Sequence, residues 1–291
     1  SNYAGQSCVA ASLFLLKPTS ATLLQKCLSA SCLKDVLNDW RFWGHPNQIA
    51  PEGAWRAWVF MGGRGAGKTR AGAEWVSEHA RNGHFGRIAL IGPTFHDVRE
   101  VMIEGDSGLR ALADERPVYE ASRKRLVWAN GAQAYCFSAE DPESLRGPQF
   151  DAAWADEMCF WAHPDETLST LEHGLRLGQK PLLMVTTTPR PIGALKKLIA
   201  ARDTIVTRSA TWDNRRNLAP DFITALSERW AGSARHRQEL LGELIEDVEG
   251  ALWSRAQLET LRSGEHGEFD RVVVAIDPPV STTRNAPGSC H

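Results

Sequence analysis

Residues 58–76 read WVFMGGRGAGKTRAGAEWV, and this stretch decides the fold. An apolar run leads into a glycine-rich turn, which fits the pattern G-x-x-x-x-G-K-[ST] over residues 62–69. The residues that follow predict a helix over 68–81. In such a loop the backbone N–H groups converge on phosphate oxygens, and the N-terminus of the next helix attracts the anion. The stretch therefore predicts a phosphate-binding loop inside an α/β domain.

The loop assigns a role to each type of residue in it. Lys68 is expected to reach the β and γ phosphates of ATP, and Thr69 is expected to offer its hydroxyl to Mg²⁺. The nucleotide-binding residues predicted from the loop are Gly62, Gly63, Arg64, Gly65, Ala66, Gly67, Lys68 and Thr69. ATP and Mg²⁺ are accordingly the expected cofactors.

A second motif, AAWADE at residues 152–157, predicts what happens to the nucleotide. An apolar strand ends there at two adjacent carboxylates. We expect Asp156 to hold the Mg²⁺ shell and Glu157 to act as the general base that orients and polarises the attacking water. The alternative is a solvated acidic helix start. Adjacent Asp and Glu at a strand end indicate a hydrolysing motor, because kinases must avoid activating water. The sequence has neither the Asn-Lys-x-Asp stretch of guanine-specific GTPases nor the LSGGQ stretch of transporter ATPases.

Length, charge and cysteine content set the limits of the interpretation. The 291 residues suffice for one large domain or two small ones. The formal net charge of -2 excludes a global nucleic-acid signature, so DNA binding would need local patches or a ring of subunits. The six cysteines have no metal-ligand spacing and are expected to be reduced thiols of a cytoplasmic protein. The apolar run 8–16 is too short to span a membrane, and no basic segment precedes it as in a signal peptide.

The remaining pattern alternates strands with helices, which favours a largely parallel sheet. The expected strands are 57–61, 87–92, 150–157, 181–189, 204–208 and 271–279, with a hairpin over 124–139 around Asn130-Gly131. The expected helices are a pair within 20–43, the helix over 68–81, then 96–104 and 107–113, and a mostly helical region over 213–262. Between strand and turn, TTTPRP at 186–191 offers Thr186, Thr187 and Thr188 as sensors of the γ phosphate; the alternative is an ordinary polar strand end.

Five blocks of sequence together resemble the large terminase subunit, the DNA-packaging motor of tailed phages and of related gene transfer agents. The blocks are GGRGAGKTRAGAEWV (62–76), SAEDPESLRGPQFDAAWADE (138–157), TTTPRP (186–191), GELIED (242–247) and VVVAIDPP (272–279). Their order and spacing agree with the family from about Trp40 to Pro279. The resemblance implies an ATPase of the additional-strand, catalytic-glutamate class with a RecA-like fold. It also implies a C-terminal ribonuclease H-like nuclease.

The resemblance also assigns residues that the motifs alone leave open. It implies that Arg64 reaches the γ phosphate within its own subunit, and that Arg146 supplies an arginine finger to a neighbouring subunit; the sequence does not decide between them. Gln48, in HPNQ, matches the adenine-recognising segment, against the alternative of a loop amide. Thr186, Thr187 and Thr188 match the coupling motif. Asp277 matches the first metal ligand of the nuclease, whose partners should lie downstream. We therefore expect a chain that ends inside the nuclease domain and cannot cut DNA.

The resulting prediction has four parts along the chain. These are an N-terminal helical, adenine-side segment (1–50), the ATPase core (51–212), a helical linker subdomain (213–265) and the first strand of the nuclease (266–291). The implied motor is a homo-oligomeric ring, a pentamer in relatives, that sits on the procapsid portal and pumps double-stranded DNA with help from a small terminase subunit. The weakly indicated DNA contacts are Arg215, Arg216, Arg235 and Arg237. Alternatives are a helicase or remodelling ATPase, or an inactive prophage remnant that only binds nucleotide.

Overall fold

The computed structural model describes residues 39–112, 116–231, 233–245 and 260. With the exception of Thr260, these belong to the first of two units into which the chain divides, residues 1–246 and 247–291. The pair of helices predicted within 20–43 lies mostly outside the described residues, which include only α4 (Trp40–Trp43). The strand predicted at 271–279 also lies outside them. The division of the chain into four domains stays a prediction.

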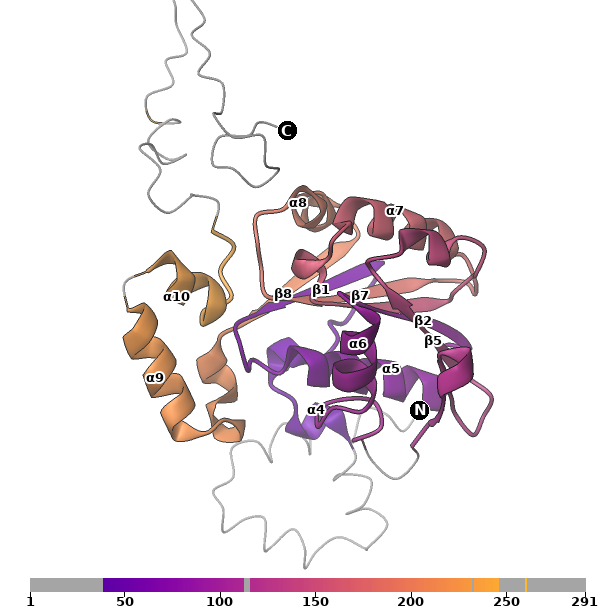
Figure 1. Cartoon of the computed structure of the whole chain (residues 1–291), viewed down its shortest axis with the longest axis horizontal. Helices are drawn as coiled ribbons and strands as arrows, with labels where there is room; N and C mark the ends of the chain where they lie inside the picture. The colour runs from indigo at the N-terminus through magenta and orange to yellow at the C-terminus, as the bar shows by residue number, and fades with distance from the viewer. Residues whose placement is uncertain (1–38, 113–115, 232, 246–259, 261–291) are drawn as a thin grey trace, which may run out of the picture. The chain divides into compact units, whose positions relative to one another are not determined.

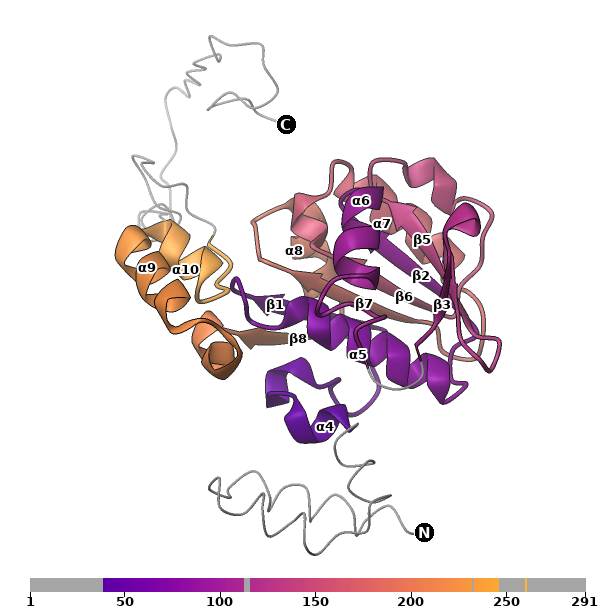
Figure 2. The same cartoon turned by 60° about the horizontal axis from the view of Figure 1, so that its bottom comes forward.

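An eight-stranded mixed sheet organises the described residues, and most of its pairings are parallel (Figures 1 and 2). Its strands are β1 (Ala57–Gly62), β2 (Arg87–Gly92), β3 (Val118–Glu120), β4 (Arg125–Val127), β5 (Gln133–Ser138), β6 (Ala152–Asp156), β7 (Leu182–Thr187) and β8 (Thr204–Ser209). The order across the sheet is β3-β4-β5-β2-β6-β7-β1-β8, and β3, β4 and β5 pair antiparallel. Strand β7 therefore lies between the strand that leads into the glycine-rich loop and the strand that ends at Asp156.

Helices cover both faces of the sheet, and the alternation along β1 shows why. Trp58 and Phe60 point into a core shared with α5 (Lys68–Arg81), whereas Val59 and Met61 point into a second core shared with α7 (Pro164–Gly174) and α8 (Gly193–Ala200). All six residues of β1 are buried, as expected for a parallel strand that is covered on both faces. Figure 1 shows α7 and α8 on one side of the sheet and α5 on the other.

The remaining helical segments of the described residues lie between or after these elements. They are η1 (Pro46–Gln48), α6 (Phe95–Asp97), η2 (Val98–Ile103), η3 (Ala121–Arg123), η4 (Pro142–Leu145), η5 (Met158–Phe160), η6 (Thr211–Asn217), α9 (Pro220–Trp230) and α10 (Ala234–Glu239). Among the described residues, no helix combines the length and the apolar character needed to cross a membrane.

Most predicted elements are confirmed, and their ends shift by one or two residues. Helix 68–81 and strand 87–92 agree with α5 and β2 at both ends. The hairpin is present as β4 and β5, with Gly131 in the left-handed region of its turn. The helical region predicted from 213 onward is present as η6, α9 and α10 where the chain is described.

The helix predicted over 107–113 is wrong for the described residues 107–112, which form successive turns. Gly105 and Gly108 disfavour a continuous helix here. Leu109 and Arg110 donate their N–H groups to the carbonyls of Met102 and Ile103 at 2.9 and 3.0 Å, respectively. The backbone therefore folds back on η2 instead of extending. The sequence pattern also missed β3, α7 and α8. Pro164 at the helix start and the spacing of Leu168 and Leu171 were available signals for α7.

Candidate nucleotide-binding site

A cavity of about 1520 Å³ opens at the carboxyl ends of β1, β6 and β7. The glycine-rich loop forms its floor, the strand ends form one wall, and residues of η6, α9 and α10 form another. We call Asp156, Glu157 and Thr186–Thr188 the sheet wall, and the segment that spans η6, α9 and α10 the helical wall. In parallel α/β sheets, ligands bind outside the carboxyl ends of the strands, which is where this cavity lies.

The loop is folded in the conformation that its glycines permit. Gly67 has a φ of 82°, in the left-handed region, and α5 begins at the next residue. Lys68 thus starts the helix with its side chain only 7% exposed. Its ammonium donates to the carbonyls of Gly62 and Gly63, both at 3.2 Å, and to Oγ1 of Thr188 at 3.0 Å. A buried cation at a helix N-terminus, aimed across the cavity floor, is suited to bind phosphate.

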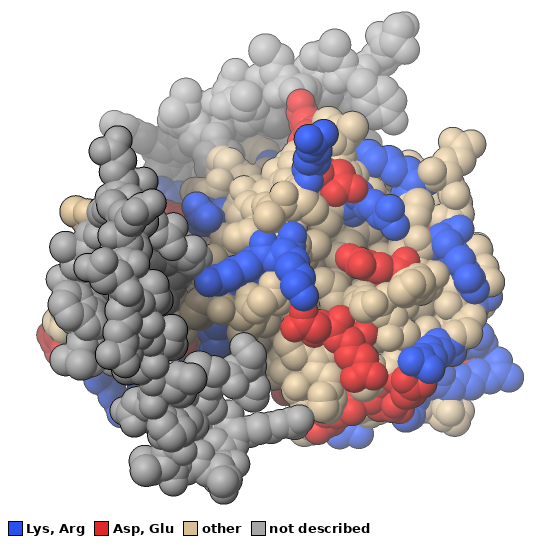
Figure 3. All heavy atoms as spheres, turned by 90° about the horizontal axis from the view of Figure 1, so that it is seen from above, with Lys and Arg blue, Asp and Glu red and all other residues tan. Residues whose placement is uncertain are grey.

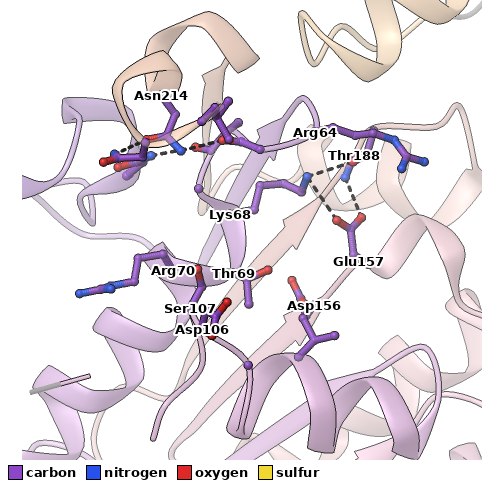
Figure 4. Close-up of a pocket in the computed structure, with 18 of the residues that line it drawn as sticks. Arg64, Lys68, Thr69, Arg70, Asp106, Ser107, Asp156, Glu157, Thr188 and Asn214 are labelled. Carbon is purple, nitrogen blue, oxygen red and sulfur yellow. Dashed lines mark hydrogen bonds and ion pairs between the residues drawn. The ribbon is translucent and has the colours of Figure 1, made fainter. Parts of the chain in front are cut away.

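Glu157 reaches the same ammonium from the sheet wall. Its Oε1 lies 3.2 Å from Nζ of Lys68, and its Oε2 accepts the N–H of Thr188 at 3.0 Å (Figure 4). The backbone of Glu157 is left-handed, with a φ of 49°, and its N–H donates to the carbonyl of Thr186 at 2.6 Å. A non-glycine residue held in this region costs free energy and persists only where its surroundings fix it. The strand end therefore turns sharply to present Glu157 to the cavity.

Asp156 occupies the last position of β6 and is buried. Its Oδ1 accepts a hydrogen bond of 2.5 Å from Oγ1 of Thr186, its partner across β6 and β7. Burial, followed by repulsion from Glu157, raises the pKa of Asp156 from 3.8 to about 7, against the opposing effects of Thr186 and Lys68. Two adjacent carboxylates in one wall therefore differ in environment, since Glu157 is 30% exposed and faces a cation.

The three threonines of the predicted coupling motif are all buried, and each makes hydrogen bonds at the ends of β6 and β7. Thr186 also accepts the indole N–H of Trp154 at 2.8 Å. Thr187 accepts the N–H of Cys159 at 3.1 Å, just beyond Glu157. Thr188 contacts both Lys68 and Glu157, as described above. The Thr186 hydroxyl thus bonds to Asp156, and Thr188 connects Lys68 with Glu157 through its hydroxyl and its backbone N–H. The role of the three threonines in coupling stays a prediction.

The residues predicted for Mg²⁺ offer hard oxygen donors. Figure 4 shows the hydroxyl of Thr69 and the carboxylate of Asp156 on the same side of the cavity floor. Hydroxyl and carboxylate oxygens suit Mg²⁺, which keeps several waters and takes further ligands from phosphate. Within the described ranges no group of three or more His, Cys, Asp or Glu side chains forms a metal site by itself. The pair fits a metal that arrives with a nucleotide.

Arg64 points away from the floor, toward the helical wall. Its Nε donates to Oε2 of Glu239 at 2.8 Å, and its backbone N–H donates to the carbonyl of the same residue at 2.6 Å. The Glu239 side chain is 5% exposed, whereas that of Arg64 is 56% exposed. Arg64 thus lines the cavity while its guanidinium pairs with Glu239, and its contact with the γ phosphate stays a prediction.

The helical wall makes further bonds to the loop backbone. Oγ1 of Thr211 donates to the carbonyl of Arg64 at 2.7 Å, and Nδ2 of Asn214 donates to the carbonyl of Gly65 at 2.7 Å. A side chain in place of the Gly63 hydrogen would meet the carbonyl oxygen of Leu240 at 2.5 Å, so only glycine permits this approach. The helical wall is thus bonded to the loop itself.

Gln48 is placed beside the loop but uses its amide within the chain. It is 4% exposed; its Nε2 donates to the carbonyl of Ala66 at 2.8 Å, and its Oε1 accepts the N–H of His45 at 3.0 Å. Gln48 therefore lies at the cavity as predicted, but its amide anchors the loop in this conformation. Its role toward adenine stays a prediction.

Arg146 does not reach the cavity of its own chain. It follows η4, is 67% exposed and pairs with Glu143 at 3.0 Å. It lines a separate concavity of about 340 Å³ beside the C-terminal part of α7, together with His173 and Arg176. Its role as an arginine finger for a neighbouring subunit stays a prediction.

The four arginines that weakly indicated DNA contacts fall into two groups. Arg215 and Arg216 line the nucleotide cavity. Arg237 pairs with Glu243 at 2.7 Å, and Arg235 lies over the ring of Trp230 at 5.6 Å. Figure 3 shows that, on the face it draws, Lys and Arg side chains are interspersed with Asp and Glu. Asp277, the predicted nuclease ligand, lies outside the described residues.

Sequence reasoning missed the contacts of Glu239, Thr211 and Asn214 with the loop. These residues are separated from it by between 147 and 175 positions. Nothing in their local pattern marks them, because each is an ordinary polar residue of a helical segment. Cys136 and Cys159, the two cysteines within the described ranges, are buried and free, and burial raises the pKa of Cys136 to about 12.

Known protein families and solved structures show what this chain is similar to. The family described as "Terminase large subunit, T4likevirus-type, N-terminal" matches residues 59–260. A comparison with curated protein sequences gives no match. Similar folds occur in the ATPase domain of the large terminase of Thermus phage P74-26 (18% identity, TM-score 0.58, covering 75% of this chain and 98% of that one). They also occur in the large terminase of a second, thermophilic bacteriophage (16%, 0.56, 72% and 52%).

The large terminase of the second phage has also been solved in complex with ADP. That structure matches with 16% identity and a TM-score of 0.54, and the match covers 72% of this chain and 52% of the phage protein. This chain thus spans about half the length of the second phage's large terminase. At such low identities the likeness establishes the fold. The family match covers well over half of the 291 residues. On that basis, the chain belongs to the terminase large-subunit family.

Proposed function

We propose that this chain is the ATP-hydrolysing motor part of a DNA-packaging terminase. The observation that carries the proposal is the convergence of Lys68, Glu157 and Thr188 at the floor of the cavity, within 3.2 Å of one another in pairs. A phosphate-binding cation and a solvent-accessible carboxylate then face each other where a triphosphate would end. The large terminase of the second phage, solved with ADP and with ATP-gamma-S, supports a nucleotide as the ligand.

In the proposed reaction, Lys68 binds the β and γ phosphates of ATP and gives up its ion pair with Glu157. Glu157 then holds the attacking water and takes its proton as the water oxygen bonds to the γ phosphorus. The bond between the γ phosphorus and the β–γ bridging oxygen breaks, so that ADP and inorganic phosphate leave. Thr69 and Asp156 would hold Mg²⁺, which neutralises charge on the phosphate oxygens when it is bound. Because β7 lies between β1 and β6, the topology also supports the additional-strand, catalytic-glutamate class.

The signal from hydrolysis has two routes out of the site. The first is the proposed coupling motif Thr186–Thr188, in which Thr188 contacts both Lys68 and Glu157, the two residues that give up their ion pair when ATP binds. The second is Arg64, which connects the loop to Glu239 in the helical wall. Arg64 would move to the γ phosphate when ATP binds, and Arg146 would serve the site of a neighbouring subunit. Each arginine would stabilise negative charge on the transferred phosphoryl group.

The assembly in which this happens is the remaining part of the proposal. The chain would act in a homo-oligomeric ring, a pentamer on a portal in the host cytoplasm, and would move double-stranded DNA into a phage or gene-transfer-agent procapsid. A small terminase subunit would present the DNA, and Asp277 would be the first metal ligand of a nuclease site. Contacts to DNA would involve its backbone, since packaging ignores sequence.

The test is steady-state hydrolysis of ATP with Mg²⁺, measured without DNA, with long double-stranded DNA and with single-stranded DNA. We expect hydrolysis by the wild type, stimulation by DNA, and a loss of hydrolysis in Lys68→Ala. The matched control is Lys197→Ala, an exposed lysine paired with Asp165 at 3.0 Å. If the wild type bound ATP but hydrolysed it under none of these conditions, the result would favour the nucleotide-binding remnant. Stimulation by single-stranded but not double-stranded DNA would favour a helicase.

A further inference from the structure

The Lys and Arg side chains that line the nucleotide cavity differ in whether they have an acidic partner. Within the described ranges there are five of them. Three pair with a carboxylate: Arg64 with Glu239 at 2.8 Å, Lys68 with Glu157 at 3.2 Å and Arg70 with Glu74 at 2.7 Å. The other two, Arg215 and Arg216 of η6, are exposed, and neither makes an ion pair with a described residue. The cavity therefore contains two cations whose charge no carboxylate of the described chain neutralises.

The segment that carries these two arginines is held against the glycine-rich loop. Before them, Nδ2 of Asn214 donates to the carbonyl of Gly65 at 2.7 Å, and Figure 4 shows Asn214 next to the loop. After them, Leu218 lies so close to Gly65 that a Cβ on this glycine would meet Cδ2 of Leu218 at 2.9 Å. Arg215 and Arg216 thus stand between two contacts with the loop. Their backbone is fixed beside the cavity floor without any contribution from their own side chains.

The acidic residue of the same segment is occupied elsewhere. Asp213 is the one acidic residue of η6, and it also lines the cavity. Its Oδ2 accepts the hydroxyl of Ser209 at 2.9 Å and the N–H of Ala210 at 2.8 Å, at the start of η6. A single exposed arginine is usually just solvated, but guanidinium groups bind phosphate through paired N–H donors, and two of them in a concave site attract anions. The arrangement suits a ligand with several anionic oxygens.

We propose that Arg215 and Arg216 bind the phosphate chain of the nucleotide held by their own chain, from the helical wall, while Lys68 binds it from the floor. This deepens the proposed function, on which it rests. It assigns the two arginines to the nucleotide instead of to DNA, because both line the cavity that contains the glycine-rich loop. The helical wall then contacts the nucleotide as well as the loop. When the γ phosphate leaves, the bound anion loses charge, so the nucleotide holds the helical wall less tightly.

The experiment compares the Kd of ATP and of inorganic triphosphate, each with Mg²⁺, for the wild type and for the double variant Arg215→Ala/Arg216→Ala. Inorganic triphosphate carries a phosphate chain and no base. We expect the double variant to raise both Kd values by about 10-fold, since an ion pair of an exposed arginine is worth up to about a factor of five. The variant Arg215→Lys/Arg216→Lys should recover most of the affinity, because ammonium groups attract phosphate as point charges.

The control is Arg229→Ala, which removes an exposed arginine of α9 that does not line the cavity. It should leave both Kd values within about a factor of two of the wild type. An unchanged Kd for ATP in the double alanine variant would overturn the proposal. A rise for ATP without a rise for inorganic triphosphate would also overturn it, because the two arginines would then contact the base or the ribose.

Binding of long double-stranded DNA to the same variants, without nucleotide, separates the proposal from a role in gripping DNA. We expect the double alanine variant to bind DNA about as well as Arg229→Ala does. A selective loss of DNA binding with an unchanged Kd for ATP would assign Arg215 and Arg216 to DNA and overturn the proposal. If the wild type bound neither ATP nor inorganic triphosphate, the proposed function itself would fail, and this proposal with it.

Discussion

The two walls of the cavity are built in different ways. The sheet wall comprises Asp156, Glu157 and three threonines at the ends of buried strands. The Asp156 side chain bonds to that of Thr186, and the side chains of Glu157 and Thr188 both contact Lys68. The helical wall bonds chiefly to backbone groups of the loop, and it makes one ion pair with the loop, between Glu239 and Arg64. Most of its described side chains are exposed. Rigid strand ends suit chemistry that requires a fixed geometry. A segment attached by a few bonds can change position when those bonds are exchanged.

The largest expected effect comes from the floor that both walls share. Lys68→Ala removes the cation that pairs with Glu157 and lies close to the buried Asp156. We expect the affinity for ATP to fall by about 10²–10³-fold, because truncating one partner of a buried charge pair costs about 2–5 kcal/mol. Calorimetric titration with ATP measures this. An affinity within a factor of three of the wild type would show that the cavity is not the phosphate site.

The next largest effect is expected for Asp156 in the sheet wall, where the free energy of unfolding should depend on pH. Because its pKa is raised from 3.8 to about 7, chiefly by burial, the folded protein without nucleotide binds an extra proton between these values. The free energy of unfolding should therefore decrease as pH rises from about 4 to 7. Asp156→Asn removes that cost, and we expect it to raise the free energy of unfolding at pH 8 by about 1–3 kcal/mol and to have little effect near pH 4.

Denaturant unfolding at both pH values measures this difference. Asp106→Asn, which changes an exposed carboxylate in the same cavity, is the matched control. A destabilised Asp156→Asn at pH 8 would contradict the account, since it would mean that the ionised carboxylate is stabilising. The same variant should hydrolyse ATP slowly, because Asp156 is the proposed ligand of Mg²⁺.

Site features that have a local sequence signal could be predicted, whereas contacts between positions far apart in the chain could not. The loop at 62–69 and the carboxylates at 156 and 157 carry local signals: glycines before a helix, and acids after an apolar strand. The lateral order of the strands, which places Thr186 opposite Asp156, was not predicted, because it depends on pairing between segments far apart in the sequence. The partner of Arg64 could not be predicted, because an ion pair between positions 64 and 239 has no local pattern.

The helical wall should respond more weakly than the floor. Glu239→Gln weakens the ion pair that holds the Arg64 side chain away from the cavity floor, so we expect ATP to bind several-fold more tightly and ADP to bind nearly as before. This selectivity follows if Arg64 turns to the γ phosphate. Glu243→Gln is the control, since Glu243 pairs with exposed Arg237 at 2.7 Å in the same segment. Equal changes for ATP and ADP would show that the pair has no role in sensing the γ phosphate.

The smallest effect on the isolated chain is expected for Arg146, which belongs to neither wall. Arg146→Ala should leave the affinity for ATP within a factor of two, since the residue is 67% exposed and lies outside the cavity. Its effect on hydrolysis should appear only where subunits assemble, and mixing the variant with Glu157→Gln subunits checks this. Arg123→Ala, another exposed arginine, serves as the control. A large loss of ATP affinity in Arg146→Ala would contradict a role between subunits.

The measurement that tests the central claim most directly is single-turnover hydrolysis of bound ATP by the wild type and by Glu157→Gln. The substitution keeps the size of the side chain and removes its ability to accept a proton from water. The account predicts that both proteins bind ATP and that the variant forms ADP about 10²–10⁴-fold more slowly, the usual contribution of a general base. Equal rates of ADP formation at full occupancy would contradict the assignment of Glu157 and with it the proposed chemistry of the sheet wall.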